Sequence, residues 1–256
     1  MIDLHCHILP GVDDGSKTMA QSLAMAQVAV ENGITHILVT PHHMDSDYTN
    51  HKQKVIKHTV QFQQAIDQAK IPLKVFPGQE VHLTGDLLAA LDQDDILFAD
   101  TGNRYLMLEF PHQEVPAYAQ RMIFDLQARN IIPVIVHPER NQGIQADPTI
   151  LYDLVASGCL TQLTASSYLG VFGDEIMKFM QQIIDAGLGF VFASDAHNLK
   201  GRNFRMKRAF DKLRKENGQE LVDTFQNNAK AIINGDLIVP TGFTQVAKKK
   251  KRFWLF

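Results

Sequence analysis

Short apolar runs alternate with helical patterns seven times along this chain of 256 residues. Most of the runs are unbroken stretches of Val, Ile, Leu and Phe, the pattern of parallel strands that are buried on both faces. No glycine-rich nucleotide loop follows the first run, which favours a closed or nearly closed α/β barrel over an open doubly wound sheet. We predict the strands at residues 1–4, 34–39, 73–76, 105–108, 131–136, 160–163 and 190–193.

The segments between these strands have helical spacing or a helix-permissive composition. We expect Ser16 to cap a first helix at residues 17–31, which Asn32 and Gly33 end. Residues 96–98 are interpreted as a minor extended piece. No domain boundary interrupts the pattern, so we predict one domain over residues 1–240 and a tail over residues 241–256. The remaining helices are predicted at residues 51–70, 85–91, 115–129, 148–157 and 175–186, with two or three more before residue 234.

The composition fits a globular protein of the cytoplasm. An apolar content of 45% over this length supports one large core. No apolar run approaches the ~18 residues of a membrane-spanning helix, and the N-terminus lacks the basic start and apolar stretch of a signal peptide. The two cysteines, Cys6 and Cys159, do not suggest a disulfide framework, so a reducing compartment is expected.

The predicted tail differs in charge from the rest of the chain. Residues 248–252 supply five of the 25 basic residues, and without them 20 basic residues stand against 28 acidic ones. The chain then ends in the apolar residues 253–256. Two interpretations stay open: a solvated end, which is usual for a run of charges, and a peripheral contact with an anionic membrane surface or with a membrane-associated partner.

Side chains that bind metal ions follow most of the predicted strands. His5 and His7 come directly after the first strand, and residues two apart in an extended backbone point to the same side. The carboxyl ends of the strands in a parallel barrel converge on one rim, where active sites are built. Six strand ends carry such residues, which chance does not readily explain, so we expect them to face one cavity. They are His5, His7, His42, Glu80, Glu109, His137, Asp195 and His197, with Asp14 within reach from the first loop.

The types of these residues predict the class of metal and the chemistry. Imidazoles and carboxylates without thiolates favour Mn²⁺, Fe²⁺, Zn²⁺ or Mg²⁺. One ion takes about four to six ligands, so the set implies two or three ions, with a carboxylate such as Glu80 as a bridge. Clustered ions suit the hydrolysis of phosphate esters, because they generate a hydroxide at neutral pH and clamp the phosphoryl oxygens.

Two arginines near these strand ends are candidate phosphate contacts. Arg140 lies three residues beyond His137, and Arg202 lies five residues beyond His197. A guanidinium matches two phosphate oxygens in a bidentate fork. A surface salt bridge is the alternative, and phosphate contact is favoured over it for Arg140 more than for Arg202.

The motifs, taken in order, resemble those of the polymerase-and-histidinol-phosphatase (PHP) superfamily over residues 1 to about 240. Within that superfamily, residues 7–16 and 164–167 are similar to the manganese-dependent tyrosine phosphatases of Gram-positive capsule and exopolysaccharide loci. The motifs are His5-Cys6-His7, Thr40-Pro41-His42, Gly78-Gln79-Glu80, Leu108-Glu109-Phe110, His137-Pro138-Glu139-Arg140 and Ser194-Asp195-Ala196-His197.

The resemblance implies a distorted (β/α)₇ TIM-like barrel that holds three metal ions, with Mn²⁺ as the expected cofactor. The implied substrate is a phosphotyrosine-bearing protein, often the tail of a bacterial tyrosine kinase that controls polysaccharide export. The implied ligand sets are His5, His7, Glu80 and Asp195 for one ion, Glu80, Glu109 and His137 for a second, and Asp14, His42 and His197 for a third.

We hypothesise that a hydroxide bridging the ions attacks phosphorus in line while Arg140 and Arg202 hold the equatorial oxygens. Tyrosine leaves as a phenolate of pKa ~10, so a strong general acid is not essential, and His42 or a bound water is the candidate proton donor. Three alternatives stay open: a PHP phosphatase acting on a small phosphomonoester such as histidinol phosphate, a nuclease-like relative, and a non-catalytic scaffold that docks on the kinase.

A cysteine-dependent phosphatase is set aside. Such enzymes need an arginine six residues after the nucleophilic thiolate, but Val12 follows Cys6 at that spacing and Ala165 follows Cys159. Cys6 also alternates with its two histidine neighbours along the extended backbone, so its side chain is predicted to point away from the metal ligands into the barrel wall.

Overall fold

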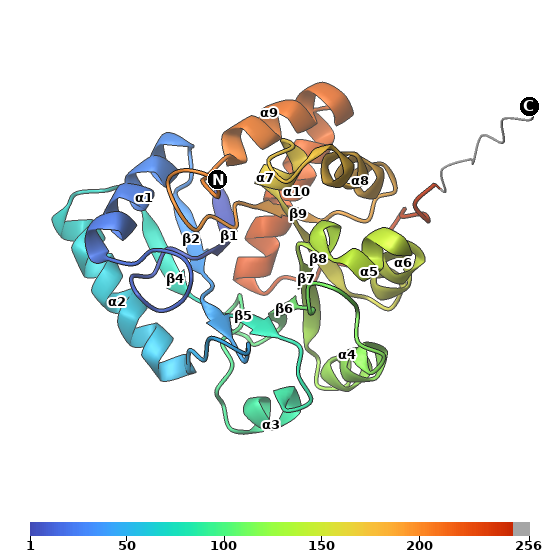
Figure 1. Cartoon of the computed structure of the whole chain (residues 1–256), viewed down its shortest axis with the longest axis horizontal. Helices are drawn as coiled ribbons and strands as arrows, with labels where there is room; N and C mark the ends of the chain where they lie inside the picture. Colours follow the sequence, from blue (N-terminus) through green and yellow to red (C-terminus); the bar gives the residue numbers. More distant parts are fainter. Residues whose placement is uncertain (248–256) are drawn as a thin grey trace, which may run out of the picture.

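The computed structural model describes residues 1–247, and its centre is a ring of parallel strands (Figure 1). Neighbouring strands run parallel in both of its sheets. One sheet has the order β1 (Ile2–Cys6), β2 (His36–Val39) and β4 (Lys74–Pro77). The other has the order β3 (His42–His43), β5 (Glu80–His82), β6 (Tyr105–Glu109), β7 (Ile132–Val136), β8 (Leu160–Thr164) and β9 (Val191–Ala193).

The two sheets form one ring because the chain passes twice from a strand of the first sheet directly into a strand of the second. β2 and β3 are separated only by Thr40 and Pro41, and β4 and β5 only by Gly78 and Gln79. A Cβ on Gly78 would lie 2.8 Å from Cγ of Leu38, so a residue without a side chain is required where the two paths pass this closely. The barrel is distorted at these two places, where a strand position is divided into two short strands.

The barrel closes between its first and last strands. The amide of His7 donates to the carbonyl of Ala196 at 3.0 Å, and the amide of Asp195 donates to the carbonyl of His5 at 2.9 Å. Seven strand positions therefore complete the ring, which confirms the predicted single-domain (β/α)₇ barrel. The closing bonds also place the two ends that carry the predicted ligands side by side.

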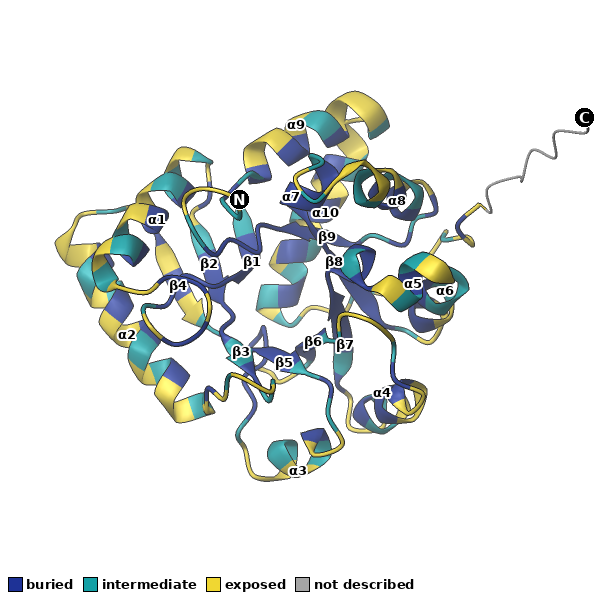
Figure 2. Ribbon diagram, in the orientation of Figure 1, coloured by how far each residue is buried: buried dark blue, intermediate teal, exposed yellow. Residues whose placement is uncertain are grey.

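The helices lie around the ring, with buried faces against the strands and exposed faces toward solvent (Figure 2). Their apolar residues recur at helical spacing, which gives each helix one side to bury. The helices are α1 (Met19–Glu31), α2 (Lys52–Gln68), α3 (Leu87–Asp92), α4 (Ala119–Gln127), α5 (Gln142–Ala146), α6 (Thr149–Ala156), α7 (Ala165–Tyr168), α8 (Asp174–Asp185), α9 (Met206–Asn217) and α10 (Gln219–Asn234), with a 3₁₀ turn η1 at Pro138–Arg140.

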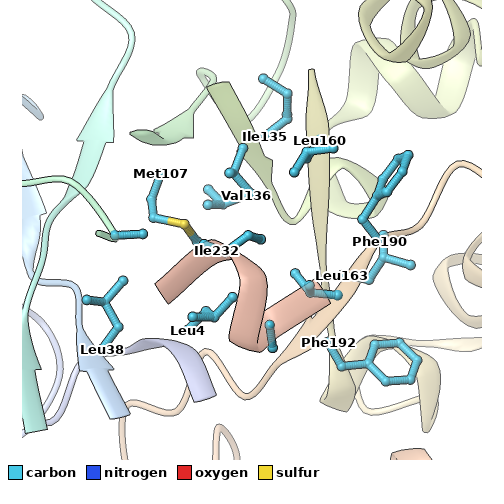
Figure 3. Close-up of a cluster of buried hydrophobic side chains, with 14 of the residues drawn as sticks. Leu4, Leu38, Met107, Ile135, Val136, Leu160, Leu163, Phe190, Phe192 and Ile232 are labelled. Carbon is cyan, nitrogen blue, oxygen red and sulfur yellow. The ribbon is translucent and has the colours of Figure 1, made fainter. Parts of the chain in front are cut away.

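Helix α10 covers the end of the barrel at which the strands begin. Its Asn228 donates to the carbonyl of Phe190, just before β9, at 3.0 Å, and the hydroxyl of Tyr105, at the start of β6, donates to the carbonyl of Asp236 at 2.5 Å. Figure 3 shows Ile232 of α10 within a cluster of buried side chains contributed by β1, β2, β6, β7, β8 and β9. This end is therefore closed by apolar packing, and the opposite rim is left for chemistry.

Two local expectations differ from the structure. Thr18 caps α1, because its side chain accepts from the amide of Gln21, whereas Ser16 is buried and donates to the carbonyl of Thr18. The prediction of an extended piece at 96–98 is wrong, because this segment belongs to none of the strands that the structure describes.

The described part of the predicted tail lies on the body of the protein. The amide of Thr244 donates to the carbonyl of Ala186 at 2.8 Å, the ring of Phe243 meets Tyr152 edge-on at 5.5 Å, and Val246 is buried. The basic and aromatic run at 248–256, to which the membrane or partner contact was assigned, lies outside the described residues. Within residues 1–247, no helix combines the length and apolarity that a membrane crossing requires.

Candidate metal centre

The predicted ligands of β1 meet at the open rim of the barrel. His5 and His7 point to the same side of the extended backbone, and their Nε2 atoms lie 3.1 Å apart. Both side chains are fully buried. Two buried imidazole nitrogens face one another at this distance only when a proton or a cation lies between them or beside them.

Glu80 stands at the centre of the predicted ligands. Its Oε2 lies 3.2 Å from Nε2 of His5, 3.1 Å from Nε2 of His7 and 3.0 Å from Nδ1 of His42. Its Oε1 lies 2.7 Å from Nε2 of His137. The Glu80 side chain has no solvent exposure, so this carboxylate is held among four imidazoles, as a bridging ligand would be.

Asp14, His42 and His197 form the solvent-facing side of the rim. Oδ1 of Asp14 lies 3.2 Å from Nε2 of His197 and 3.5 Å from Nε2 of His42. The Asp14 side chain is 43% exposed, whereas that of His197 is 2% exposed. The rim is therefore reached from solvent past Asp14, whereas the neighbouring Asp13 is buried and its carboxylate lies against Nδ1 of His7.

Glu109 and His137 complete the side opposite Asp14. Oε1 of Glu109 lies 3.7 Å from Nε2 of His137, and Oε2 lies 3.7 Å from Nδ1 of His42. His137 has a φ of +34° and Asp195 a φ of +50°, a backbone region that non-glycine residues rarely adopt. Strain of this kind persists where the surrounding structure requires it, and here both residues turn predicted ligands into the rim.

The two predicted arginines converge on Asp195. Oδ2 of this carboxylate lies 2.6 Å from Nη2 of Arg140 and accepts from Nη2 of Arg202 at 2.8 Å. Oδ1 lies 3.6 Å from Nε2 of His5 and 3.5 Å from Nε2 of His7. One carboxylate therefore links the arginine pair to the histidine cluster.

All nine predicted ligands thus lie together, and ligand atoms from seven of them fall into three overlapping groups of the size that holds an ion. Within each group the atoms lie within 4.8 Å of one another. The groups are His7, Asp14, His42 and His197; His5, His7 and Glu80; and His42, Glu80 and Glu109. His137 and Asp195 adjoin these groups through the contacts given above.

The partners of the ring nitrogens hold the histidines in place, and sequence reasoning missed them. Nδ1 of His7 lies 2.8 Å from Oδ2 of Asp13, and Nδ1 of His5 lies 2.8 Å from Oε1 of Gln162. Each bond occupies Nδ1 and leaves Nε2 aimed at the rim, as in many metal sites. The available signal for Gln162 was an amide in the middle of β8, whose five residues are all buried.

Unsatisfied buried atoms test whether this rim fits a cation. Nδ1 of His42, Oε2 of Glu80, Oδ1 of Asp195 and Nε2 of His197 are all buried and make no hydrogen bond, although they lie close to one another. Buried polar atoms almost always find partners. Atoms of both ligand types left without hydrogen bonds at one rim are what a divalent ion would satisfy, so the residues present fit such ions.

The pKa values of the metal-free cluster follow from the same contacts. Burial lowers the pKa of His7, but Asp13 and Glu80 more than offset this and raise it to about 9. Burial raises the pKa of Glu80, but His5 and His42 hold it well below its usual value. The surrounding imidazoles therefore hold the Glu80 carboxylate in its ionised form, which is the form that binds a cation.

Cys6 takes no part in the rim. Its side chain is fully buried in the core, and its Sγ lies 3.6 Å from the carbonyl oxygen of Ala196. Burial raises the pKa of the thiol well above its usual value, with the carboxylates of Asp3 and Asp195 adding to the effect. A thiol that stays protonated is a poor nucleophile, which agrees with its predicted place in the barrel wall.

Sequence comparisons place this chain beside a group of bacterial proteins. The family model described as capsular polysaccharide synthesis, CpsB/CapC, matches residues 1–234. The chain is 40% identical to tyrosine-protein phosphatase YwqE of Bacillus subtilis over 256 residues, which is the full length of both. It is 34% identical over 255 residues to the putative tyrosine-protein phosphatase CapC of Staphylococcus aureus, again with full coverage of both chains.

Solved structures agree with these matches. One described as YwqE from Bacillus subtilis and CpsB from Streptococcus pneumoniae, unique metal-dependent tyrosine phosphatases, has a TM-score of 0.93 at 39% identity. The match covers 97% of this chain and 100% of that one. A mutant of the organophosphorus hydrolase from Deinococcus radiodurans matches with a TM-score of 0.54 at 13% identity, covers 90% of this chain and 92% of that one, and shows a shared fold alone.

Proposed function

The chain belongs to the CpsB/CapC family of capsular polysaccharide synthesis, and on this basis we propose that it is a metal-dependent tyrosine-protein phosphatase. The observation that carries the proposal is the open rim, where nine imidazole and carboxylate side chains adjoin two arginines. Metal ligands beside phosphate-binding groups are what a phosphomonoester hydrolase requires.

We assign the ligands to ions as follows. Glu80 and Glu109 with His137 would hold one ion, Glu80 and Asp195 with the two histidines of β1 would hold a second, and Asp14, His42 and His197 would hold a third. Imidazole and carboxylate donors without a thiolate support Mn²⁺ as the working ion, ahead of Fe²⁺, Zn²⁺ and Mg²⁺. When bound, such ions supply a nucleophilic water at neutral pH and neutralise charge on the phosphoryl oxygens.

The chain's own side chains position the phosphoryl group. Arg140 is largely buried and its guanidinium also stands over the ring of Phe172 at 5.3 Å, so it is held in place before substrate arrives. Arg202 is more exposed and forms an ion pair with Asp195. This position lets it contact the phosphoryl group from the solvent side. Both guanidiniums stabilise the charge that develops on the equatorial oxygens.

The leaving group needs little help from the protein. Tyrosine departs as a phenolate of pKa ~10, so proton transfer is not the main barrier. His42 directs Nδ1 toward Glu80 and Nε2 toward Asp14, which supports a ligand role over the proton-donor role considered for it. A water at the exposed Asp14 side is the simpler proton source.

We extend the proposal to the substrate and its place in the cell. The substrate is proposed to be a phosphotyrosine segment of a bacterial tyrosine kinase that acts in polysaccharide export, met in the cytoplasm at the inner face of the membrane. The family description, capsular polysaccharide synthesis, and the relatives named tyrosine-protein phosphatases support this proposal. The basic and aromatic run at residues 248–256 is proposed to favour that location.

Parallel assays test this function. The purified full chain, supplied with Mn²⁺, is given a phosphotyrosine peptide, the matched phosphoserine peptide and histidinol phosphate. We expect kcat/KM for the phosphotyrosine peptide to exceed both others by about 100-fold or more, because phenolate leaves more readily and an aromatic ring fits the rim. Preference for histidinol phosphate would favour the small-molecule alternative, and no hydrolysis would favour the docking scaffold.

A further inference from the structure

A second cluster of metal-binding side chains lies on the β5–β6 side of the rim. Asp45, His82 and Glu109 offer one ligand atom each, and these three atoms lie within 4.8 Å of one another. Only Glu109 belongs to the nine residues assigned above. The cluster therefore brings two new side chains, one imidazole and one carboxylate, to the edge of the proposed metal centre.

The pairing of β5 with β6 positions two of the three ligands, His82 and Glu109. His82 comes two residues after Glu80 on β5, so both side chains point to the same side of the strand. His82 pairs in register with Glu109 of β6, and its Nδ1 lies 3.2 Å from Oε2 of that carboxylate. The geometry is therefore set by parallel strands and not by a chance meeting of loops.

The third ligand, Asp45, comes from the loop after β3. Its Oδ1 accepts from the amide of Asp47 at 2.5 Å, which fixes the carboxylate within its own loop. Within residues 1–247, no lysine or arginine forms an ion pair with Asp45 or with Glu109. Among the charged side chains, the two carboxylates thus face imidazoles alone.

Exposure distinguishes this cluster from the centre. The side chains of His82 and Glu109 are 23% and 18% exposed, whereas Glu80 is fully buried. A site with three protein ligands and open access keeps water in its remaining coordination positions. An ion there would exchange more readily than ions held by the buried ligands.

We infer that Asp45, His82 and Glu109 form an additional, exchangeable divalent-cation site at the rim. One nitrogen and two carboxylate oxygens suit Mn²⁺ or Zn²⁺. The inference depends on the proposed function only through Glu109, which the two sites share. Its Oε2 faces both His82 and His42, so the additional site adjoins the centre directly.

Metal titration of the full chain tests this inference. Free Mn²⁺ is measured by electron paramagnetic resonance as ion is added to metal-free protein, for the wild type and for Asp45→Asn, His82→Gln and Asp47→Asn. Asp47 is an exposed carboxylate in the same loop and provides the matched control. We expect the wild type to show a weaker binding step beyond the tight ones, which Asp45→Asn and His82→Gln weaken by about tenfold or more while Asp47→Asn does not.

The outcomes separate this inference from the proposed function. A wild type without a weaker step, or an Asp45→Asn variant that retains it at full affinity, would overturn the additional site while leaving the tight ions and phosphotyrosine hydrolysis in place. Loss of the weaker step in both variants, with the tight steps unchanged, would support it. Absence of tight binding or of phosphotyrosine hydrolysis in the wild type would instead count against the proposed function.

Discussion

The two ends of the barrel are built on opposite principles. At the α10 end, apolar side chains such as Ile232 and Phe225 are buried, and the polar groups are paired: the Tyr105 hydroxyl donates to the carbonyl of Asp236 and accepts from the amide of Ile238 at 3.0 Å. At the open rim, by contrast, four buried imidazole and carboxylate atoms, one each from His42, Glu80, Asp195 and His197, make no hydrogen bond. The closed end carries stability, and the rim keeps polar atoms unsatisfied for ions and substrate.

Substitutions at the two ends are therefore expected to affect different properties, stability at the closed end and activity at the rim. Removing an apolar side chain from the closed end loses burial and leaves a cavity, so the free energy of unfolding falls while the rim is unchanged. Removing a ligand from the rim relieves a crowded polar cluster, so chemistry is lost with little cost in folding. Paired substitutions at the two ends test whether the division holds.

The largest effect is expected for His137→Ala at the rim. Loss of this imidazole removes a proposed ligand beside Glu80, so kcat/KM for a phosphotyrosine peptide should fall by about 1000-fold or more and bound metal should decrease. Steady-state kinetics and metal analysis on the same samples measure both. His112→Ala, in the exposed loop after β6, is the matched control. Near-normal turnover in His137→Ala would remove the rim from the mechanism.

The next effect concerns the closed end. Ile232→Ala should lower the free energy of unfolding by about 3 kcal/mol, because a fully buried side chain is lost from the α10 cluster. Urea unfolding measures this change, and the exposed Leu237→Ala should have almost no effect. Turnover of folded Ile232→Ala should match the wild type, and a large fall in kcat would show that the two ends are coupled.

A smaller effect is expected when a supporting residue changes. Asp13→Asn keeps the size of the side chain but removes the charge that faces Nδ1 of His7, so metal affinity should fall by about 10- to 100-fold. Competition with a chelating dye measures the affinity. The exposed Glu114→Gln in the loop after β6 controls for the loss of one negative charge at this rim. Unchanged affinity in Asp13→Asn would mean that the ring is oriented by other contacts.

The two ends should also respond differently to pH. The pKa of His7 in the metal-free protein is raised to about 9, so its imidazole is protonated at neutral pH and must lose a proton when it binds an ion. Metal affinity should therefore rise between about pH 6 and 9, by up to about tenfold per unit for each proton released. Isothermal titration calorimetry in buffers of different ionisation enthalpy counts the protons, and a flat profile would contradict the assignment.

The same pKa has the opposite effect on the metal-free fold. A group whose folded pKa lies above its unfolded value stabilises the protein at low pH, and this contribution is lost as the pH rises toward about 9. Metal-free protein should thus become less stable over the range in which metal affinity increases. Urea unfolding of chelated samples checks the sign, and greater stability at the higher pH would show that other groups dominate.

The smallest effect is expected at the mouth of the rim. The ring of Tyr48 stacks on His42 with centroids 6.0 Å apart and an interplanar angle of 16°, which provides an aromatic wall beside the exposed Asp14. Tyr48→Ala should raise KM for a phosphotyrosine peptide by about 3- to 10-fold with little change in kcat, and Tyr48→Phe should resemble the wild type. An equal rise in KM for a phosphoserine peptide would argue against a contact with the substrate ring.

Most residues of the rim could be predicted from the sequence because they lie just after the predicted strands. Each buried apolar run marks a parallel strand, and parallel strands bring their carboxyl ends together, so His5, Glu80 and Asp195 were expected to meet although they are distant in the chain. The fold and its closure follow from the same runs. Whether the nine residues bind ions stays a prediction until metal is measured.

The supporting contacts could not be predicted in this way, because they depend on side-chain packing across strands. Gln162 reaches His5 from the opposite part of the ring, and His82 joins Glu109 through strand register, which no local pattern specifies. The prediction that Ser16 caps the first helix was wrong for a related reason. The Ser16 hydroxyl accepts from the hydroxyl of Ser22 in a buried pair, and Thr18 caps the helix instead.

Metal dependence measured on one sample tests the central claim most directly. The full chain is stripped of metal by chelation, its metal content is determined, and hydrolysis of a phosphotyrosine peptide is followed before and after Mn²⁺ is restored. The account predicts that the stripped protein keeps less than about 1% of the restored rate, with recovery in proportion to bound ion. Full activity in protein shown to contain no metal would contradict it.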